Sequence, residues 1–219
     1  MREKLFDTDR YIFILSEIIN QQYRIIETTP EYIIKTIAPV FNRKGYVGTS
    51  ISDLTKATGL TKGAIYGNFK NKEDLAVRAF KYNIRSELSE LRNAIKNAER
   101  SLDKLYAITS FYRGYYDSTK KLGGCPILNI GTDANHTNPI LHNMVKVTTN
   151  KLEGSIEQII LTGIENHEIK KDIDTKKMAR NFYSMIEGCM FMATIHNDRS
   201  YLINMMDHID EIIKTKLAL

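Results

Sequence analysis

The sequence predicts an all-α protein built from two helical bodies. Apolar residues recur three or four positions apart almost throughout the 219 residues, which is the spacing of helices with one buried face. No glycine/serine linker, internal repeat or low-complexity segment interrupts this pattern. With 42% hydrophobic residues the chain can bury a sizeable core, so a disordered protein is excluded.

The first helix after an N-terminal extension is expected to begin at Pro30, with Thr29 as its cap. We expect Gly45 to end this helix. Pro39 should kink it, because a proline inside a helix removes one backbone donor and crowds the preceding turn. The buried stripe is expected to contain Ile33, Ile34, Ile37, Val40 and Phe41.

Two short helices follow. Ser50 is expected to cap the first of them, with Asp53 in the capping-box position three residues later. Residues 58–60, Thr-Gly-Leu, form the turn, and Thr61 caps a third helix of about two turns. Two side chains four positions apart should point from this helix to the core, namely Ile65 and Phe69.

A long fourth helix is expected from the cap at Asn71 to about Ala98. Its roughly 25 residues would span ~37 Å, enough to join the two bodies. The second body begins near Ser101 with SLDKLYAITSFYRGYY, followed by a break at Gly-Gly-Cys-Pro. Further helices are expected at about 126–133, 139–166, 174–196 and 200–217, with Asn138-Pro139 and Asp174 as the clearest starts.

The last two predicted helices, 174–196 and 200–217, are apolar on more than one face. A helix with two apolar faces needs two packing partners. We therefore expect a second copy of the chain to cover part of their surface, which makes the protein a homodimer.

The positive charge is concentrated in one short segment. Between Arg43 and Lys81 there are eight basic and three acidic residues, an excess equal to the formal +5 of the whole chain. Residues 103–219 contain 14 of each. Such a concentration is typical of a surface that binds a polyanion, although a solvated basic surface is the alternative.

Several functional classes find no support in the sequence. Cys125 and Cys189 lie far apart and show no metal-ligand spacing, and the five histidines form no i,i+4 pair, so we expect no disulfide, metal site or cofactor and a reducing cytoplasm. No acid/base pair, phosphate loop or cofactor motif indicates an enzyme. The apolar run at residues 11–19 is interrupted by Glu17 and is expected to be neither a signal peptide nor a membrane span.

The segment TKGAIYGNF meets the demands on a helix that reads the major groove of DNA. Such a helix brings its N-terminal end to the base edges while its other side packs on a supporting helix. Lys62 and the small Gly63 allow close approach, and Tyr66 follows one turn later. Lys70 and Lys72 flank the start of the next helix, where free amides also favour a phosphate. Packing of Tyr66 in the core and simple solvation of Lys72 are the alternatives.

Residues 31–82 resemble the DNA-binding domain of the TetR family of bacterial transcriptional regulators. The matching stretch is FNRKGYVGTSISDLTKATGLTKGAIYGNFKNKEDLAVRAF, in which glycines, caps, aromatic residues and lysines fall in register. FYRGYY and GGCPILNIGTDANHTNPIL resemble a subgroup that carries a Gly-Cys-Pro segment after its fifth helix. The resemblance covers about residues 30–217, and the first 28 residues have no counterpart of known role in the family.

The resemblance implies three parts: an N-terminal extension at 1–28, a three-helix helix-turn-helix DNA-binding domain at 29–82, and an effector-binding and dimerisation bundle at 83–219. It makes Thr49 and Ser50 phosphate contacts and Lys72 a phosphate anchor. Gly67-Asn68 departs from the family's usual bulky pair, so the operator sequence does not transfer. The candidate DNA-contacting residues are Thr49, Ser50, Thr61, Lys62, Gly63, Tyr66, Asn68, Lys70 and Lys72.

By the same resemblance the protein is a homodimeric regulator, most often a repressor, that releases a palindromic double-stranded DNA operator on binding a small molecule. An effector-independent architectural DNA-binding dimer is the alternative, and an enzyme or carrier that retains such a domain is a second one. Surplus aromatic and methionine residues suggest an apolar effector pocket, although plain core packing also explains them. Its expected lining is drawn from Phe111, Tyr115, Ile127, Met144, Phe182 and Met185. Cys125 is expected to be a buried thiol, with a redox sensor as the alternative.

Overall fold

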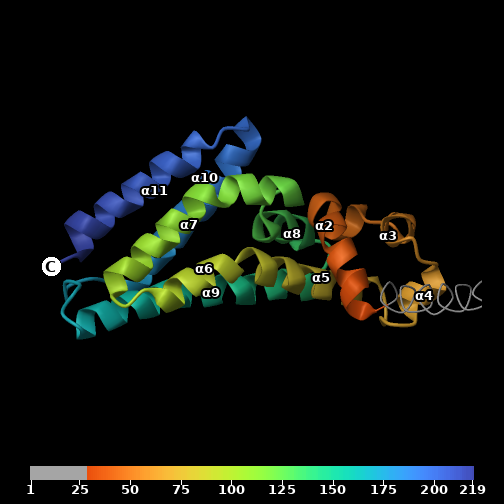
Figure 1. Ribbon diagram of the computed structural model, residues 1–219, viewed down its shortest axis with the longest axis horizontal. Helices are drawn as coiled ribbons and strands as arrows, with labels where there is room; N and C mark the ends of the chain where they lie inside the picture. Colours follow the sequence, from red (N-terminus) through yellow and green to blue (C-terminus); the bar gives the residue numbers. More distant parts are fainter. Residues whose placement is uncertain (1–28) are drawn as a thin grey trace, which may run out of the picture.

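The computed structural model describes residues 29–219, which form an elongated all-helical molecule without a β-strand in this part of the chain (Figure 1). The expectations for the N-terminal extension lie outside the described residues. The helices are α2 (Pro30–Gly48), α3 (Ile51–Thr58), α4 (Lys62–Tyr66), α5 (Lys72–Glu87), α6 (Ser89–Asn97), α7 (Ser101–Leu122), α8 (Pro126–Ala134), α9 (Pro139–Glu165), α10 (Thr175–His196), α11 (Ser200–Ile212) and a final π-helical turn (Ile213–Leu217).

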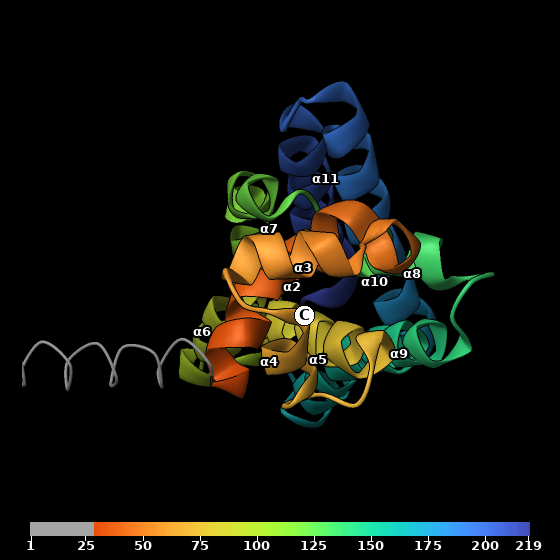
Figure 2. The same ribbon diagram turned by 90° about the vertical axis from the view of Figure 1, so that its right-hand side faces the viewer.

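The molecule has two ends. Helices α2, α3 and α4 lie at one end, and α7, α10, α11 and the distal half of α9 extend to the other (Figure 1). Helix α5 leads from the first end into α6, which packs along α7. Helix α2 packs on both α5 and α8, so α8 joins the two bodies. The view along the molecule from its α4 end shows α3 and α4 in front of the remaining helices (Figure 2).

Helix α2 begins and is interrupted where the sequence predicts. The hydroxyl of Thr29 accepts a hydrogen bond from Tyr32 N at 3.2 Å, and Pro30 is the first helical residue. The backbone leaves the helical region at Gly45, with φ 71° and ψ 178°, angles that are open essentially to glycine alone. Pro39 keeps helical backbone angles, and the kink expected there stays a prediction.

The caps of the next two helices are confirmed. Ser50 and Asp53 form a capping box at the start of α3, and Gly59 ends α3 in the left-handed conformation with φ 71°. Thr61 accepts a hydrogen bond from Ala64 N at 3.2 Å at the start of α4. Helix α4 is shorter than the two turns predicted, because Asn68 N turns back to Ile65 O at 3.1 Å and ends the regular helix.

The prediction of a single long fourth helix is wrong. Leu88, with φ −92° and ψ 8°, separates α5 from α6. Leu88 and Leu91 are both buried, and α6 packs along α7, so tertiary packing turns the chain at a point without glycine or proline. Asn71 caps α5 as expected, by accepting a hydrogen bond from Asp74 N at 2.8 Å.

In the second body the predicted starts at Asn138 and Asp174 are confirmed, because both side chains cap their helices. Gly123 caps the end of α7, and Gly123 and Gly124 both have positive φ, which makes the turn into α8. The last helix follows the prediction to Ile212 and then widens into the π-helical turn. One continuous apolar core extends through both bodies.

Candidate nucleic-acid interface

The two short helices α3 and α4 form a rigid unit at the end of the molecule. Leu54 of α3 and Ile65 of α4 are completely buried, and Phe69 just beyond α4 is buried beside them. The left-handed Gly59 makes the turn between the helices, and no atom lies within 4 Å of a Cβ built there. Because the inner faces are packed, the outer face of α4 is held in one orientation.

The first turn of α4 presents its small and basic side chains to solvent. Thr61, Lys62 and Gly63 are all exposed. The nearest atom to a Cβ built on Gly63 is the hydroxyl of Thr61 at 4.0 Å, so the surface is open at this position. A backbone without a side chain in open space allows a large partner to come close. Asn68 and Lys70 are exposed on the turn that follows.

Tyr46 lies near both Tyr66 and Lys72, and it is not among the predicted contact residues. The amine of Lys72 lies 4.6 Å from the centre of the Tyr46 ring, a cation–π contact. Burial lowers the pKa of Lys72, and Asp133 and Asp53 oppose this change. Burial also raises the pKa of Tyr66, with Tyr46 as the second cause. The sequence signal that could have indicated Tyr46 is its position as an aromatic residue directly after Gly45.

The two residues before α3 that are expected to contact phosphate differ in their exposure to solvent. Thr49 is 1% exposed and its hydroxyl donates to Gly45 O at 2.6 Å, and its expected phosphate contact stays a prediction. Ser50 is exposed, and its hydroxyl and amide both donate to Asp53 at 2.8 Å. Lys44 pairs with Asp53 at 2.5 Å and, with Ser50, lowers the pKa of that carboxyl.

The positive charge at this end is largely uncompensated. Lys62, Lys70 and Lys72 form no ion pair with any residue between 29 and 219. Arg78 is paired with Asp74 at 2.8 Å on the exposed face of α5, and such exposed pairs contribute little to stability. The exposed start of α4 and the start of α5 thus form one basic surface suited to a polyanion.

A polar joint connects this end to the second body. Asn42 of α2 donates to Leu122 O at 3.0 Å and to Gly124 O at 2.8 Å, and Asn129 of α8 donates back to Asn42 O at 3.0 Å. Asp133 of α8 accepts from Tyr46 N at 2.6 Å. The Gly-Gly-Cys-Pro segment therefore lies against the helix that supports the basic surface.

The six predicted pocket residues all pack on the core, and three are buried more deeply than the others. Tyr115, Ile127 and Phe182 are buried, while Phe111, Met144 and Met185 are half-buried. The rings of Phe111, Tyr112 and Tyr115 are in mutual contact, edge-on or tilted, with ring centres 5.1–5.2 Å apart. Tyr112 and Tyr115 are both 4% exposed, so both rings belong to the core. The effector pocket itself stays a prediction.

A polar cluster lies beside these rings. The hydroxyl of Tyr183 donates to Glu187 at 2.8 Å, and the thiol of Cys125 lies 3.7 Å from the other carboxyl oxygen. Burial raises the pKa of Glu187, and burial followed by the proximity of Glu187 raises the pKa of Cys125. A thiol held protonated in this way is a poor nucleophile, which favours the buried-thiol interpretation of Cys125.

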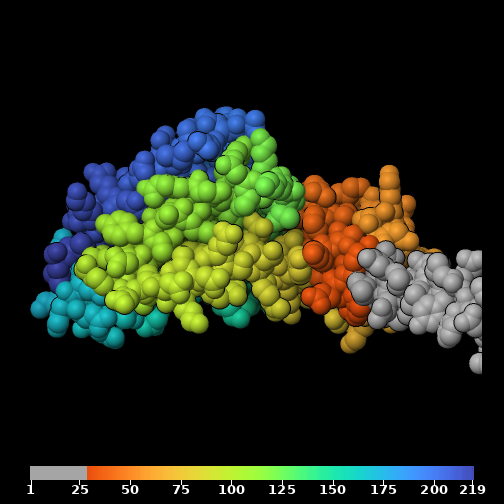
Figure 3. All heavy atoms as spheres, viewed as in Figure 1, coloured from red at the N-terminus to blue at the C-terminus, as the bar shows by residue number. Residues whose placement is uncertain are grey.

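Helix α10 also exposes a patch of large apolar side chains. Phe191 is 51% and Ile195 63% exposed, and Met192 lies between them in sequence at 38%. The space-filling view shows the C-terminal helices along the upper edge of the second body (Figure 3). A contiguous exposed apolar patch on a helix is typical of a protein–protein contact.

Comparisons with known proteins agree with this architecture. Residues 33–79 match the family described as bacterial regulatory proteins, tetR family, and residues 101–209 match the tetracyclin repressor-like C-terminal domain. A TetR-family regulator from Cytophaga hutchinsonii is 33% identical with a TM-score of 0.79, over 86% of this chain and 94% of that one.

Two further proteins extend the similarity. A TetR regulator from Chloroflexus aurantiacus is 31% identical with a TM-score of 0.82, over 86% of this chain and 96% of that one. The fatty acid metabolism regulator protein of Bacillus subtilis is 25% identical over 78% of this chain and 87% of its own. Within residues 29–219 no helix has the length and apolar character needed to cross a membrane.

Proposed function

The chain belongs to the TetR family of bacterial transcriptional regulators, and from this premise we propose that it is a ligand-responsive repressor. In this proposal a cytoplasmic homodimer binds a roughly palindromic operator and releases it when a small molecule binds the C-terminal helices. The operator is read by α4 and held at the phosphates by Ser50, Lys70 and Lys72.

One observation carries the DNA-binding part of the proposal. The exposed start of α4, with Thr61, Lys62 and the open Gly63, is held from behind by fully buried Ile65. Lys62 is then free to reach base edges in the major groove, and the backbone at Gly63 is free to approach the DNA. Lys72, next to Tyr46, lies where the N-terminus of α5 favours a phosphate.

The release of the operator is proposed to pass through the joint between α2 and α8. A ligand shifts the equilibrium between two forms only by the difference in its affinity for them. If α8 is displaced in the form that the ligand favours, the hydrogen bonds made by Asn42 and Asp133 should carry α2 with it. The helix-turn-helix unit, which packs on α2, then moves as well. The two α4 helices of a dimer then no longer match half-sites about 34 Å apart.

The test begins with selection of an operator from random double-stranded DNA with the full chain, followed by titration of the selected and a scrambled duplex. Lys62→Ala should weaken the operator by about 1–3 kcal/mol and the scrambled duplex much less, because a base contact is specific to sequence. Lys35→Ala, an exposed lysine on α2, is the control and should change neither. Equal losses on both duplexes would contradict the placement of Lys62 in the groove.

The same duplexes distinguish the proposed repressor from the alternative, an architectural dimer without an effector. Small molecules that co-purify with the protein, identified by mass spectrometry, are added back to the operator complex. A repressor of the proposed kind should lose operator affinity with at least one of them. Unchanged affinity with every bound molecule would favour the architectural function.

A further inference from the structure

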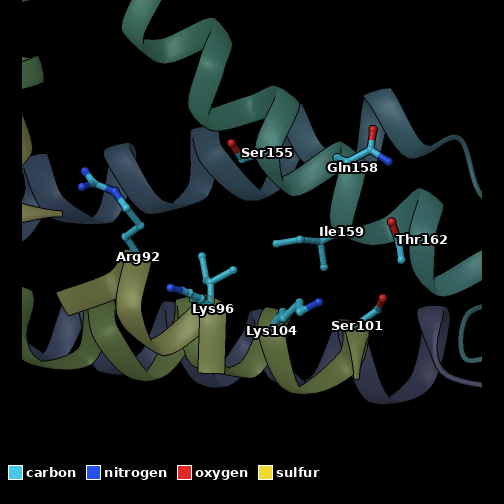
Figure 4. A pocket seen from close by; sticks show the side chains of 9 residues that line it. Arg92, Lys96, Ser101, Lys104, Ser155, Gln158, Ile159 and Thr162 are labelled. Carbon is cyan, nitrogen blue, oxygen red and sulfur yellow. The ribbon is translucent and has the colours of Figure 1, made fainter. Parts of the chain in front are cut away.

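An open cavity of about 490 Å³ lies between α6, α7 and α9, at the end of the second body away from α4 (Figure 4). Its apolar wall comes from Ile95 of α6 and Ile159 of α9. None of the six residues predicted to line the effector pocket borders it. The cavity is therefore separate from the aromatic cluster of α7.

The charges around this cavity have one sign. Arg92, Lys96 and Lys104 border it, and none of its lining residues is acidic. Within residues 29–219 these three cations form no ion pair. The nearby carboxylate of Glu168 is already engaged, because it lies 3.6 Å from Arg100 and accepts a hydrogen bond from Leu102 N at 3.3 Å. Three unpaired cations around one hollow attract an anion.

A buried hydroxyl without a partner points into the same space. Ser101, the first residue of α7, is 1% exposed, and its Oγ makes no hydrogen bond within the described chain. Figure 4 shows this hydroxyl directed from α7 toward α9, with Ile159 reaching into the gap from the opposite side. Gly163 approaches so closely that a Cβ there would lie 2.9 Å from Ser101 Cβ. A buried hydroxyl without a partner is unfavourable, and a ligand group or an ordered water in the cavity would satisfy it.

We propose that this cavity binds a small organic anion. Its carboxylate or phosphate group is held by the cations at positions 92, 96 and 104 and accepts a hydrogen bond from Ser101, while a short apolar part packs on Ile95 and Ile159. This inference rests on the proposed function, in which the anion is an effector. Helix α6 lines the cavity and continues from α5, whose first residue is Lys72, so the site and the basic surface share one helical connection.

The test is calorimetric titration of the full chain with four probes: hexyl phosphate, hexanoate, inorganic phosphate and uncharged 1-hexanol. At least one of the first two should bind at least about tenfold more tightly than 1-hexanol, because only they combine charge with an apolar part. The Lys96→Ala/Lys104→Ala variant should weaken that anion at least about tenfold. Lys177→Ala, an exposed lysine on α10, is the matched control and should leave the affinity unchanged.

Ser101→Ala separates a binding role from a structural one. This variant removes a hydroxyl that has no partner, so its thermal midpoint should stay the same or rise while anion affinity falls. The proposal is overturned if neither anion binds, if 1-hexanol binds as tightly, or if the double lysine variant keeps wild-type affinity. Operator titration with the bound anion is a separate measurement: unchanged operator affinity would contradict the effector role, and the anion site would stand.

Discussion

Lys72 combines a charge with a fixed position, because its amine lies over the ring of Tyr46. A phosphate contact releases counterions and carries no sequence information. Lys72→Ala should therefore weaken operator and scrambled DNA alike and reduce the slope of log affinity against log salt by about one. Tyr46→Leu, which keeps the charge but removes the ring, should leave the slope unchanged. Titrations at several salt concentrations measure both, and selective loss of the operator in Lys72→Ala would show that α5 does not lie on the DNA backbone.

Glu187 makes stability depend on pH. Burial raises the pKa of its carboxyl from the ordinary value of 4.5, so the folded state holds a proton that the unfolded state releases. The contribution of Glu187 to stability is therefore fully present below pH 4.5, the ordinary pKa. It is lost as the pH rises through the pKa of the folded state. Relative to Glu187→Gln, the free energy of unfolding of the wild type should fall over that range.

Urea unfolding of both proteins at a series of pH values from 4 to 9 measures this difference. The matched control is Glu165→Gln, an exposed residue at the end of α9, whose difference from wild type should not vary in the same way. A difference between wild type and Glu187→Gln that stays constant with pH would mean that the carboxyl is ionised in the folded protein.

At the scale of helices, α2 and α8 are joined where Asp133 accepts a hydrogen bond from Tyr46 N and lies against Gly45. A Cβ on Gly45 would lie 2.6 Å from the Asp133 carboxyl, and the backbone there has angles that other residues avoid. Gly45→Ala should cost at least about 1–3 kcal/mol. Gly59→Ala, also at φ 71° but with nothing within 4 Å, should cost about 1–2 kcal/mol of backbone strain alone.

A double-mutant cycle with Asp133→Ala measures the contact itself. Asp133→Ala removes the acceptor of Tyr46 N, and Gly45→Ala in that background loses the clash but keeps the strain. The two losses should therefore sum to more than the loss in the double variant. Chemical denaturation supplies the three values. Simple additivity would indicate that α2 and α8 are not coupled at this point.

Local elements were predictable from the sequence, whereas non-local ones were not. The caps at Ser50, Asn71 and Asp174 depend on bonds within three or four residues, so the chain shows them directly. The break at Leu88 depends instead on the packing of α6 along α7. For the same reason the exposed start of α4 was expected, while the contact of Tyr46 with Lys72 and Asp133 was not.

Across the whole molecule, the basic surface and the cavity bordered by α6 lie toward opposite ends. Helices α5, α6 and α9 extend along the length between them (Figure 1). The break at Leu88 divides the connection into two helices, and α6 packs mainly on α7. A change at the cavity can reach the DNA end through α5 or through α8, and the joint at Asp133 offers the second route without passing Leu88.

The whole assembly is predicted to be a dimer that forms through α10 and α11. Phe191 and Ile195 are each exposed over half or more of their surface, and a stable interface would bury such residues at its centre. Sedimentation should show a dimer at micromolar concentration, and Phe191→Asp/Ile195→Asp should shift it to a monomer, because two buried carboxylates without partners oppose association.

The dimer prediction also has a consequence for DNA. A palindromic operator is bound by two α4 helices related by a two-fold axis, and a single five-residue helix reaches too few bases to hold one half-site tightly. The Phe191→Asp/Ile195→Asp variant should therefore lose most of its operator affinity while keeping the helical circular dichroism of the wild type. Ile140→Asp, which alters an exposed apolar residue on α9, is the control and should remain dimeric and bind the operator. A wild-type chain that sediments as a monomer at micromolar concentration, yet binds the full operator tightly, would contradict the two-fold geometry on which the proposed repressor depends.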